Sequence, residues 1–157
     1  EFGHVGGGVV ELLGGSEQER AADADDRAVD RDVAVGEHAR FAVVQRATGD
    51  LVGDVALHTM GPEDRCGFFG LLIAPTRRGE GFGTDATRTL CRFAFEVMNL
   101  HRLELDVVAA NTRAWHVYEK AGFRQEGRRR ACYFHRGRYE DFIMMGMLRG
   151  ELIEEDQ

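Results

Sequence analysis

The sequence lacks any apolar run close to the roughly 20 residues that a membrane-spanning helix needs. It also lacks a basic segment followed by a short apolar core, which is the pattern of a secretory signal peptide. Its three cysteines, Cys66, Cys91 and Cys132, form neither a CxxC pair nor a Cys/His ligand spacing. This spacing argues against a disulfide framework and against a zinc site. The sequence therefore predicts a cytoplasmic protein with no membrane anchor and no bound metal.

Basic charge is also scarce, with 20 Lys and Arg against 27 Asp and Glu and a formal net charge of −7. Residues 1–35 alone hold nine acidic residues and three arginines. Phosphate backbones bind surfaces of the opposite sign, so the charge argues against a nucleic-acid partner. An acidic segment attracts cationic ligands such as amines, although a solvated helix face explains the same residues.

At 157 residues the chain has the length of one domain, and we expect a single domain over residues 1–157. Residues 1–15 fit either a strand or a loop. Hydrophobic periodicity and turn residues predict helices over 16–35, 83–98 and 111–121, and strands over 39–46, 51–60, 66–75, 101–109, 123–134 and 139–148. This order predicts an α+β fold with a mostly antiparallel sheet, a central βαβ crossover and flanking helices.

The helix over 83–98 should bury one apolar stripe, formed by Phe82, Ala86, Leu90, Phe93, Ala94 and Val97. Leu103, Leu105 and Val107 alternate with acidic residues in the strand over 101–109, and Gly122 should end the helix over 111–121.

Three glycines, Gly79, Gly81 and Gly83, alternate with other residues directly before the helix predicted over 83–98. Glycine loses the most backbone freedom on folding, so three in five residues suggest a backbone that approaches a ligand closely. A glycine loop between a strand and a helix directs N–H groups and the helix dipole at one point, which favours an anion such as a phosphate. Arg77 and Arg78 add positive charge beside it.

Two nucleotide-binding motifs can be compared with this loop. A P-loop requires a Gly-Lys pair, which the chain lacks. The dinucleotide fingerprint fits residues 81–86, with Glu104 or Asp106 about 20 residues on. However, the loop follows a hairpin, and the residues after the next strand hold one short helix and a hairpin rather than a second mononucleotide-binding half. A dinucleotide-binding domain is therefore the weaker interpretation.

Two motifs together indicate a different ligand for the glycine loop. RGEGFG at 78–83 has the Arg/Gln-x-x-Gly-x-Gly/Ala pattern, and NTRAWHVYEKAGF follows at 111–123. In this order and spacing they resemble the GNAT superfamily of acetyl-CoA-dependent N-acetyltransferases, in particular its ribosomal-protein and spermidine N-acetyltransferase branch. The resemblance covers about residues 39–149. Members of this branch open with a strand rich in Leu, Arg and Pro, and we find no such strand in residues 1–38.

The resemblance implies which residues bind acetyl-CoA. They are Leu72, Ile73, Arg78, Gly79, Glu80, Gly81, Phe82, Gly83, Thr84, Asn111, Ala114, Tyr118 and Lys120. The pyrophosphate would lie on the glycine loop, and the pantetheine arm would pair with the backbone of Leu72 and Ile73 like an added strand, where two parallel strands splay apart. Asn111 either caps its helix or binds the pantetheine arm.

Tyr118 matches the family's tyrosine that faces the sulfur of CoA, which makes it the candidate general acid for the leaving thiolate. The alternative is a core tyrosine on the same helix face as Ala114. No general base stands out, and Glu104, Glu126 and Asp141 fit surface or hairpin positions better.

The resemblance predicts transfer of an acetyl group to a primary amine, which is a protein N-terminus, a polyamine or another small amine. The alternative is a catalytically silent acetyl-CoA-binding module. A homodimer is compatible with the family, and neither a nucleic acid nor a membrane is expected as a partner.

Overall fold

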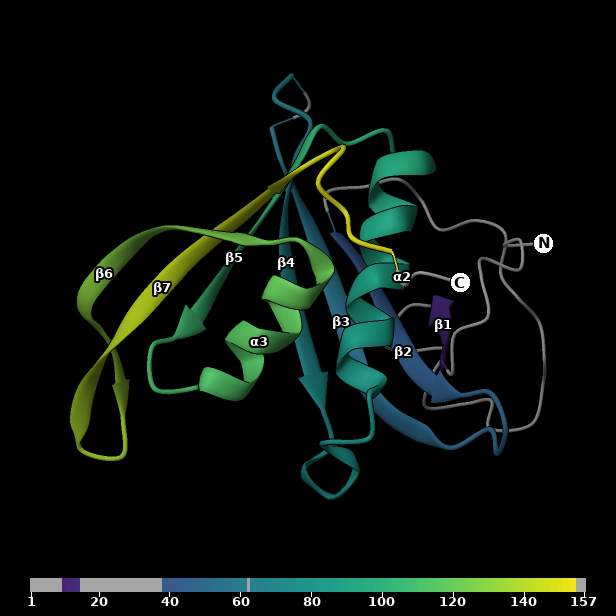
Figure 1. The fold of residues 1–157 in the computed structure, drawn as a ribbon, viewed down its shortest axis with the longest axis horizontal. Coiled ribbons are helices and arrows are strands. Elements are labelled where there is room, and N and C mark those ends of the chain that lie inside the picture. The colour runs from purple at the N-terminus through teal and green to yellow at the C-terminus, as the bar shows by residue number, and fades with distance from the viewer. Residues whose placement is uncertain (1–9, 15–37, 62, 155–157) are drawn as a thin grey trace.

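The computed structural model describes residues 10–14, 38–61 and 63–154 (Figure 1). These residues form one seven-stranded sheet in the order β1-β2-β3-β4-β5-β7-β6. The strands are β1 (Val10–Gly14), β2 (His38–Gln45), β3 (Leu51–Met60), β4 (Cys66–Ile73), β5 (Arg102–Val108), β6 (Arg124–His135) and β7 (Arg138–Leu148). All neighbouring strands are antiparallel except β4 and β5.

The parallel pair β4 and β5 is joined through a 3-10 turn (Pro75–Arg77) and helix α2 (Phe82–Glu96), which is the predicted βαβ crossover. The two strands pair only from Cys66↔Arg102 to Phe68↔Glu104. β4 continues for five residues after Phe68, and β5 continues for four residues after Glu104, but over these residues the two strands do not pair with each other. The sheet therefore splays open in its centre, as the family resemblance leads us to expect.

Helix α2 and helix α3 (Thr112–Ala121) lie on the same face of the sheet (Figure 1). The buried stripe of α2 contains Ala86, Leu90 and Ala94, as the periodicity predicts, whereas Val97 is 62% exposed and was wrongly assigned to it. Val97 follows the last residue of the helix, where the regular 3.6-residue period ends. The alternation predicted for β5 is confirmed, because Leu103, Leu105 and Val107 are all buried.

The C-terminal hairpin β6–β7 extends beyond the rest of the sheet (Figure 1). Strand β7 pairs with β5 only from Phe142 onward, so its first residues have β6 as their one partner strand among the described residues. Two irregularities in the β6 register, at Gln125/Gly127 and Arg129/Tyr133, twist this hairpin away from the sheet.

The predicted α+β class and the order of elements from residue 38 to 148 are confirmed. For residues 1–15 the sequence left a strand or a loop open, and residues 10–14 form the edge strand β1. The helix predicted over 16–35 lies outside the described residues, and the single domain over 1–157 stays a prediction. No helix in the described part of the chain is long and apolar enough to cross a membrane.

Candidate active site

A cleft of about 670 Å³ opens between the end of β4, the start of α2 and helix α3. It is lined by Leu71, Leu72, Ile73, Arg77, Arg78, Gly79, Gly81, Gly83, Thr84, Asn111, Thr112, Arg113, Ala114, His116, Val117, Tyr118 and Lys120. Eleven of the thirteen residues that the sequence assigns to the cofactor are in this set. The structure thus brings together the glycine loop and the 111–123 motif, which lie about 30 residues apart in the sequence.

The start of α2 provides free hydrogen-bond donors. The helix begins after Gly81, no described side chain caps it, and its first backbone bond runs from Asp85 N to Gly81 O. The N–H groups of Phe82, Gly83 and Thr84 therefore have no acceptor within the helix. Such a terminus carries about half a positive charge and binds anions.

Two of the three glycines are required by the backbone itself. Gly79 and Gly81 have φ values of +83° and +88°, in the left-handed region that other residues adopt at a cost. A Cβ at either position would meet no described atom within 4 Å, so both face open space. A Cβ at Gly83 would make only ordinary contacts, at 3.7–3.8 Å, with Leu71, Ile73 and Val117. Gly83 thus keeps the cleft wide rather than relieving strain.

The two arginines of the loop have different environments. Arg77 binds Glu80 and Gln45, whereas Arg78 is exposed and donates from Nε to the carbonyl of Ile73 at 3.1 Å. Among the described residues no carboxylate lies within ion-pair distance of Arg78. Its charge is therefore available to an anion in the cleft.

The open edge of β4 exposes alternate backbone groups. Ala74 N donates to Val52 O, which fixes the alternation and directs the N–H and C=O of Leu72 toward β3. The corresponding groups of Leu71 and Ile73 face the splay, where β5 has parted from β4. The sequence assigned Leu72 and Ile73 to the pantetheine arm; the register favours Leu71 in place of Leu72 for backbone pairing, while the exposed side chain of Leu72 still lines the cleft.

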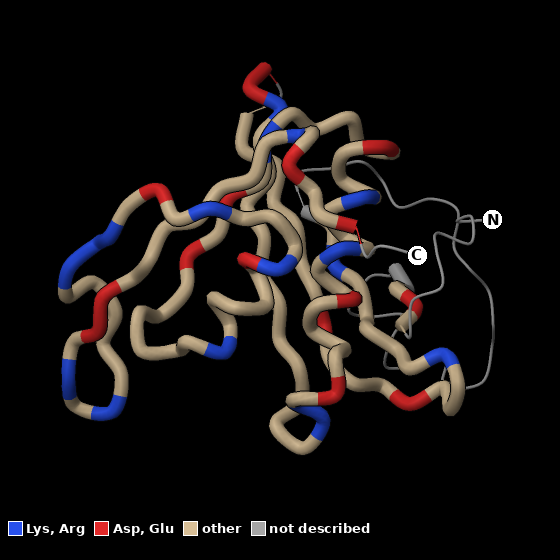
Figure 2. Tube along the Cα trace, viewed as in Figure 1, with Lys and Arg blue, Asp and Glu red and all other residues tan. Residues whose placement is uncertain are grey.

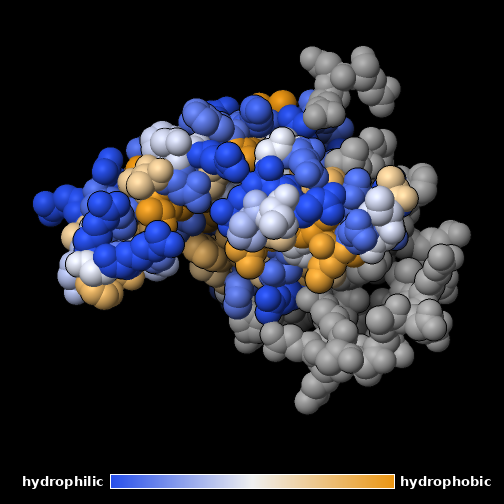
Figure 3. Space-filling view, turned by 90° about the horizontal axis from the view of Figure 1, so that it is seen from below, coloured by the Kyte–Doolittle hydropathy of each residue, from blue (hydrophilic) through white to orange (hydrophobic). Residues whose placement is uncertain are grey.

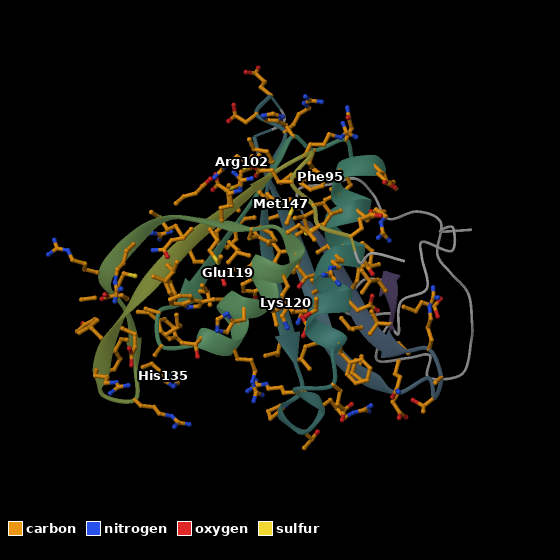
Figure 4. The ribbon with its side chains drawn as sticks, viewed as in Figure 1. Phe95, Arg102, Glu119, Lys120, His135 and Met147 are labelled. Atoms are coloured by element: carbon orange, nitrogen blue, oxygen red, sulfur yellow. The ribbon has the colours of Figure 1, made fainter. Side chains whose placement is uncertain are left out.

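Helix α3 closes the other side of the cleft. The side chain of Asn111 accepts a hydrogen bond from Ala114 N at 3.2 Å, so the predicted cap is formed. Gly122 ends the helix with a φ of +116°. Near this end, the carbonyl of Lys120 accepts a bond from Arg88 of α2 at 3.2 Å, which joins the two helices. Figure 4 shows Lys120 at this junction, far from His135 at the tip of the hairpin.

Tyr118 lies where the cleft meets the core. It is 8% exposed and packs edge-on against Phe69 and Phe123, each with a ring-centroid distance of 5.9 Å. Burial raises the pKa of its hydroxyl from 10.0 to about 12, because the charged phenolate is poorly solvated there. The side chain is thus a core tyrosine that also lines the cleft, and its catalytic role stays a prediction.

Two assigned residues do not line the cleft. Glu80 forms an ion pair with Arg77 at 3.1 Å, and Phe82 is 4% exposed in the core. Six lining residues were not assigned to the cofactor, namely Leu71, Arg77, Thr112, Arg113, His116 and Val117. The four on α3 lie within or beside the recognised motif, so the helical period of that segment could have indicated which of them face the loop.

The three weak candidates for a general base form ion pairs with arginines. Glu104 and Glu126 both bind Arg102, and Asp141 binds Arg128. The hydrogen bond from Arg102 lowers the pKa of Glu126, which makes this carboxylate a poor base. None of the three lines the cleft. Within the described ranges no group of three or more His, Cys, Asp or Glu residues is arranged to hold a metal ion.

Comparisons with known proteins agree with this geometry. Residues 12–124 match the family model of the acetyltransferase (GNAT) domain. A spermidine N(1)-acetyltransferase of Vibrio cholerae is 32% identical over 118 residues, which are 75% of this chain and 68% of that protein. The Escherichia coli spermidine N(1)-acetyltransferase is also 32% identical, over 74% of this chain and 61% of its own length.

Solved structures extend the similarity to the fold. A dodecameric structure of the Vibrio cholerae spermidine N-acetyltransferase, in an intermediate state, superposes with a TM-score of 0.69 at 33% identity, over 73% of this chain and 67% of that one. The chain thus spans about two thirds of the length of these relatives. A family match over residues 12–124, which is more than half of the chain, leads to one conclusion. This chain belongs to the GNAT acetyltransferase family.

Proposed function

We propose that this protein is an acetyl-CoA-dependent N-acetyltransferase that acts on a primary amine. The observation that carries the proposal is the uncapped N-terminus of α2, which opens onto a cleft that ends at the buried Tyr118. Free N–H groups, the exposed Arg78 and two open glycines suit a pyrophosphate. When bound there, acetyl-CoA supplies a thioester whose carbonyl carbon the amine attacks.

The residues of the cleft fit the rest of the cofactor as well. The N–H and C=O groups of Leu71 and Ile73 face the splay and can pair with the amides of a pantetheine arm, as an added strand would. One of these groups, the carbonyl of Ile73, also accepts from Arg78, which couples the phosphate end of the cleft to the strand. The arm would then lie along β4 and point toward Tyr118.

Tyr118 serves this reaction as a hydrogen-bond donor to the leaving sulfur. In acetyl transfer the new C–N bond forms, the C–S bond breaks, and the amine loses a proton that the thiolate finally gains. A complete proton transfer from a phenol of pKa about 12 to a thiolate of pKa near 8.5 is uphill by about 5 kcal/mol. The raised pKa instead keeps the hydroxyl protonated, so that it stabilises the developing negative charge.

A polyamine or a protein N-terminus is the acceptor class that we propose. Two relatives are named as spermidine acetyltransferases, and YdaF of Bacillus subtilis, 31% identical over 66% of this chain, is named as a candidate ribosomal N-acetyltransferase. The net charge of −7 favours a cationic amine over an anionic acceptor. The cytoplasmic location and a homodimeric or larger assembly stay predictions.

The test is formation of free CoA from acetyl-CoA with spermidine, with a peptide bearing a free N-terminus and with a small monoamine. CoA is measured by chromatography, because the exposed Cys132 would react with thiol reagents. We expect turnover with at least one amine. Tight CoA binding without turnover of any amine would instead support the silent module.

A variant tests the role of Tyr118 within the same assay. Tyr118→Phe keeps the aromatic packing against Phe69 and Phe123 and removes only the hydroxyl. We expect kcat to fall at least about tenfold while the affinity for CoA stays within about twofold. An unchanged kcat would remove Tyr118 from the mechanism.

A further inference from the structure

We propose that Arg77 is a positioning residue that holds the phosphate-binding loop against the β2–β3 turn, and that it does not itself bind the phosphate. This inference rests on the proposed function and concerns the same cleft. Arg77 precedes the loop, at the end of the 3-10 turn that follows β4. Its side chain is 25% exposed and reaches two separate parts of the molecule.

The contacts of Arg77 use all sides of its guanidinium group. Nε donates to Glu80 at 3.1 Å, and Nη2 donates to the side-chain carbonyl of Gln45 at 2.6 Å. Nη1 lies 3.7 Å from a carboxylate oxygen of Asp50, and the planar group lies 5.0 Å above the centre of the Phe82 ring. Two carboxylates and a ring face therefore balance its one charge.

The β2–β3 turn, which Arg77 contacts, is ordered by hydrogen bonds of its own. Gln45 N donates to Asp50 O at 2.9 Å, and Gly49 N donates to Gln45 O at 2.8 Å. The hydroxyl of Thr48 lies 2.8 Å from the Asp50 carboxylate and within 3.2 Å of the Gln45 side chain. The turn thus provides a fixed anchor next to the loop.

The loop on the other side has few contacts of its own. Gly79 and Gly81 have no described atom within 4 Å of a Cβ position, and Glu80 between them is held by Arg77. Phe82, on which the guanidinium stacks, is the first residue of α2. Arg77 therefore contacts the middle of this segment, at Glu80, and the residue that follows it, Phe82, where the glycines would otherwise allow many backbone conformations.

The consequence is a population effect on binding. If the contacts of Arg77 are lost, the loop spends part of its time in conformations whose N–H groups do not converge on one point. The apparent dissociation constant for CoA then equals the intrinsic one divided by the fraction of molecules that remain competent, so the affinity weakens as that fraction falls. Gln45, which does not line the cleft, should share in this effect because it acts through Arg77.

The experiment measures CoA affinity by calorimetry for Arg77→Met, Gln45→Ala and the double variant. We expect about tenfold weaker CoA binding for Arg77→Met and about threefold weaker binding for Gln45→Ala. The double variant should lose no more affinity than Arg77→Met, because Gln45 acts only through its hydrogen bond with Arg77. Arg92→Met is the matched control, since Arg92 lies on α2, does not line the cleft and forms an ion pair of 3.0 Å with Glu154, so its loss should leave the affinity unchanged.

Salt dependence separates positioning from direct phosphate contact. Arg77→Met should retain the salt dependence of the wild-type affinity, whereas Arg78→Met should reduce it, because a lost charge–phosphate contact removes a screened interaction. An unchanged affinity in Gln45→Ala, additive losses in the double variant, or a reduced salt dependence in Arg77→Met would each overturn the inference. Failure of the wild-type protein to bind CoA would instead refute the proposed function.

Discussion

The β6–β7 hairpin and the glycine loop both concentrate arginines, but they use them differently. Residues 124–138 contain six arginines, and four of these form ion pairs, with Glu151, Asp141, Asp106 and Glu140. None of the six lines the cleft. The loop has only two arginines, yet it combines the exposed Arg78 with three free backbone N–H groups. An anion site therefore depends on converging donors rather than on the number of cations.

The hairpin needs its charges to hold its own shape. Asp141 accepts bonds from Ala131 N at 2.8 Å and from Arg128, which together lower the pKa of its carboxyl. Tyr133 stacks on Phe142 with a centroid distance of 5.3 Å. Figure 2 shows acidic and basic residues side by side along the two strands, and from below the hairpin surface is mostly hydrophilic (Figure 3). These contacts fasten two strands that project beyond β5.

The largest loss of CoA affinity is expected when a glycine of the loop is replaced, with a glycine of the hairpin as the matched control. Gly81 and Gly137 have φ values of +88° and +81°, so an alanine strains either backbone by about 1–2 kcal/mol. Gly81→Ala should weaken CoA binding at least about tenfold, because the loop shifts to relieve the strain. Gly137→Ala should lower only the free energy of unfolding. Calorimetry and thermal unfolding measure both, and a similar loss of affinity in the two variants would contradict the distinction.

An arginine pair should give a smaller effect. Arg78→Met is expected to weaken CoA binding about fivefold, since an exposed charge–phosphate contact contributes about 1 kcal/mol. Arg138→Met removes an arginine that already binds Glu140 and should change the affinity less than twofold. If the hairpin variant lost as much affinity as the loop variant, the cofactor would have to reach the hairpin.

The smallest expected effect is a change in the free energy of unfolding at high pH, and it distinguishes two tyrosines. Burial raises the pKa of Tyr118 to about 12, so its stabilising contribution is complete below pH 10 and is lost as the pH rises toward 12. Between pH 9 and 10.5 this loss is on the order of 1 kcal/mol of unfolding free energy. Tyr118→Phe should remove this part of the decline, and Tyr139→Phe, at a hairpin position that is 67% exposed, should not. Denaturant titrations at the two pH values measure the free energy of unfolding. An equal decline in the wild-type protein and in both variants would show that the Tyr118 hydroxyl is solvated.

Much of the fold follows from local sequence patterns. The alternation in β5, the Asn111 cap and the glycine after α3 each depend on residues a few positions apart, and each prediction is confirmed. The choice between strand and loop for residues 10–14 stayed open because β1 is a five-residue edge strand in a glycine-rich segment, where alternation is too short to detect. Val97 was misplaced because its helix ends one residue earlier.

The site was only partly predictable. The two motifs indicated most residues that line the cleft, since loop and helix termini have local signatures. The sequence did not distinguish Leu71 from Leu72, because the direction of their backbone groups depends on the register with β3. It assigned Arg78 and not Arg77 to the cofactor, but it did not indicate that Arg77 contacts Gln45, 32 residues away.

The sequence by itself determined the order of strands and helices, the place of the glycine loop and the family, because these depend on short-range periodicity and on motif spacing. Only the tertiary structure decided where β4 parts from β5, which arginine remains available to an anion, and how Tyr118 comes to be buried beside the cleft. These features arise from contacts between segments that are distant in the chain. Their energies depend on register, burial and pairing, which no local pattern encodes.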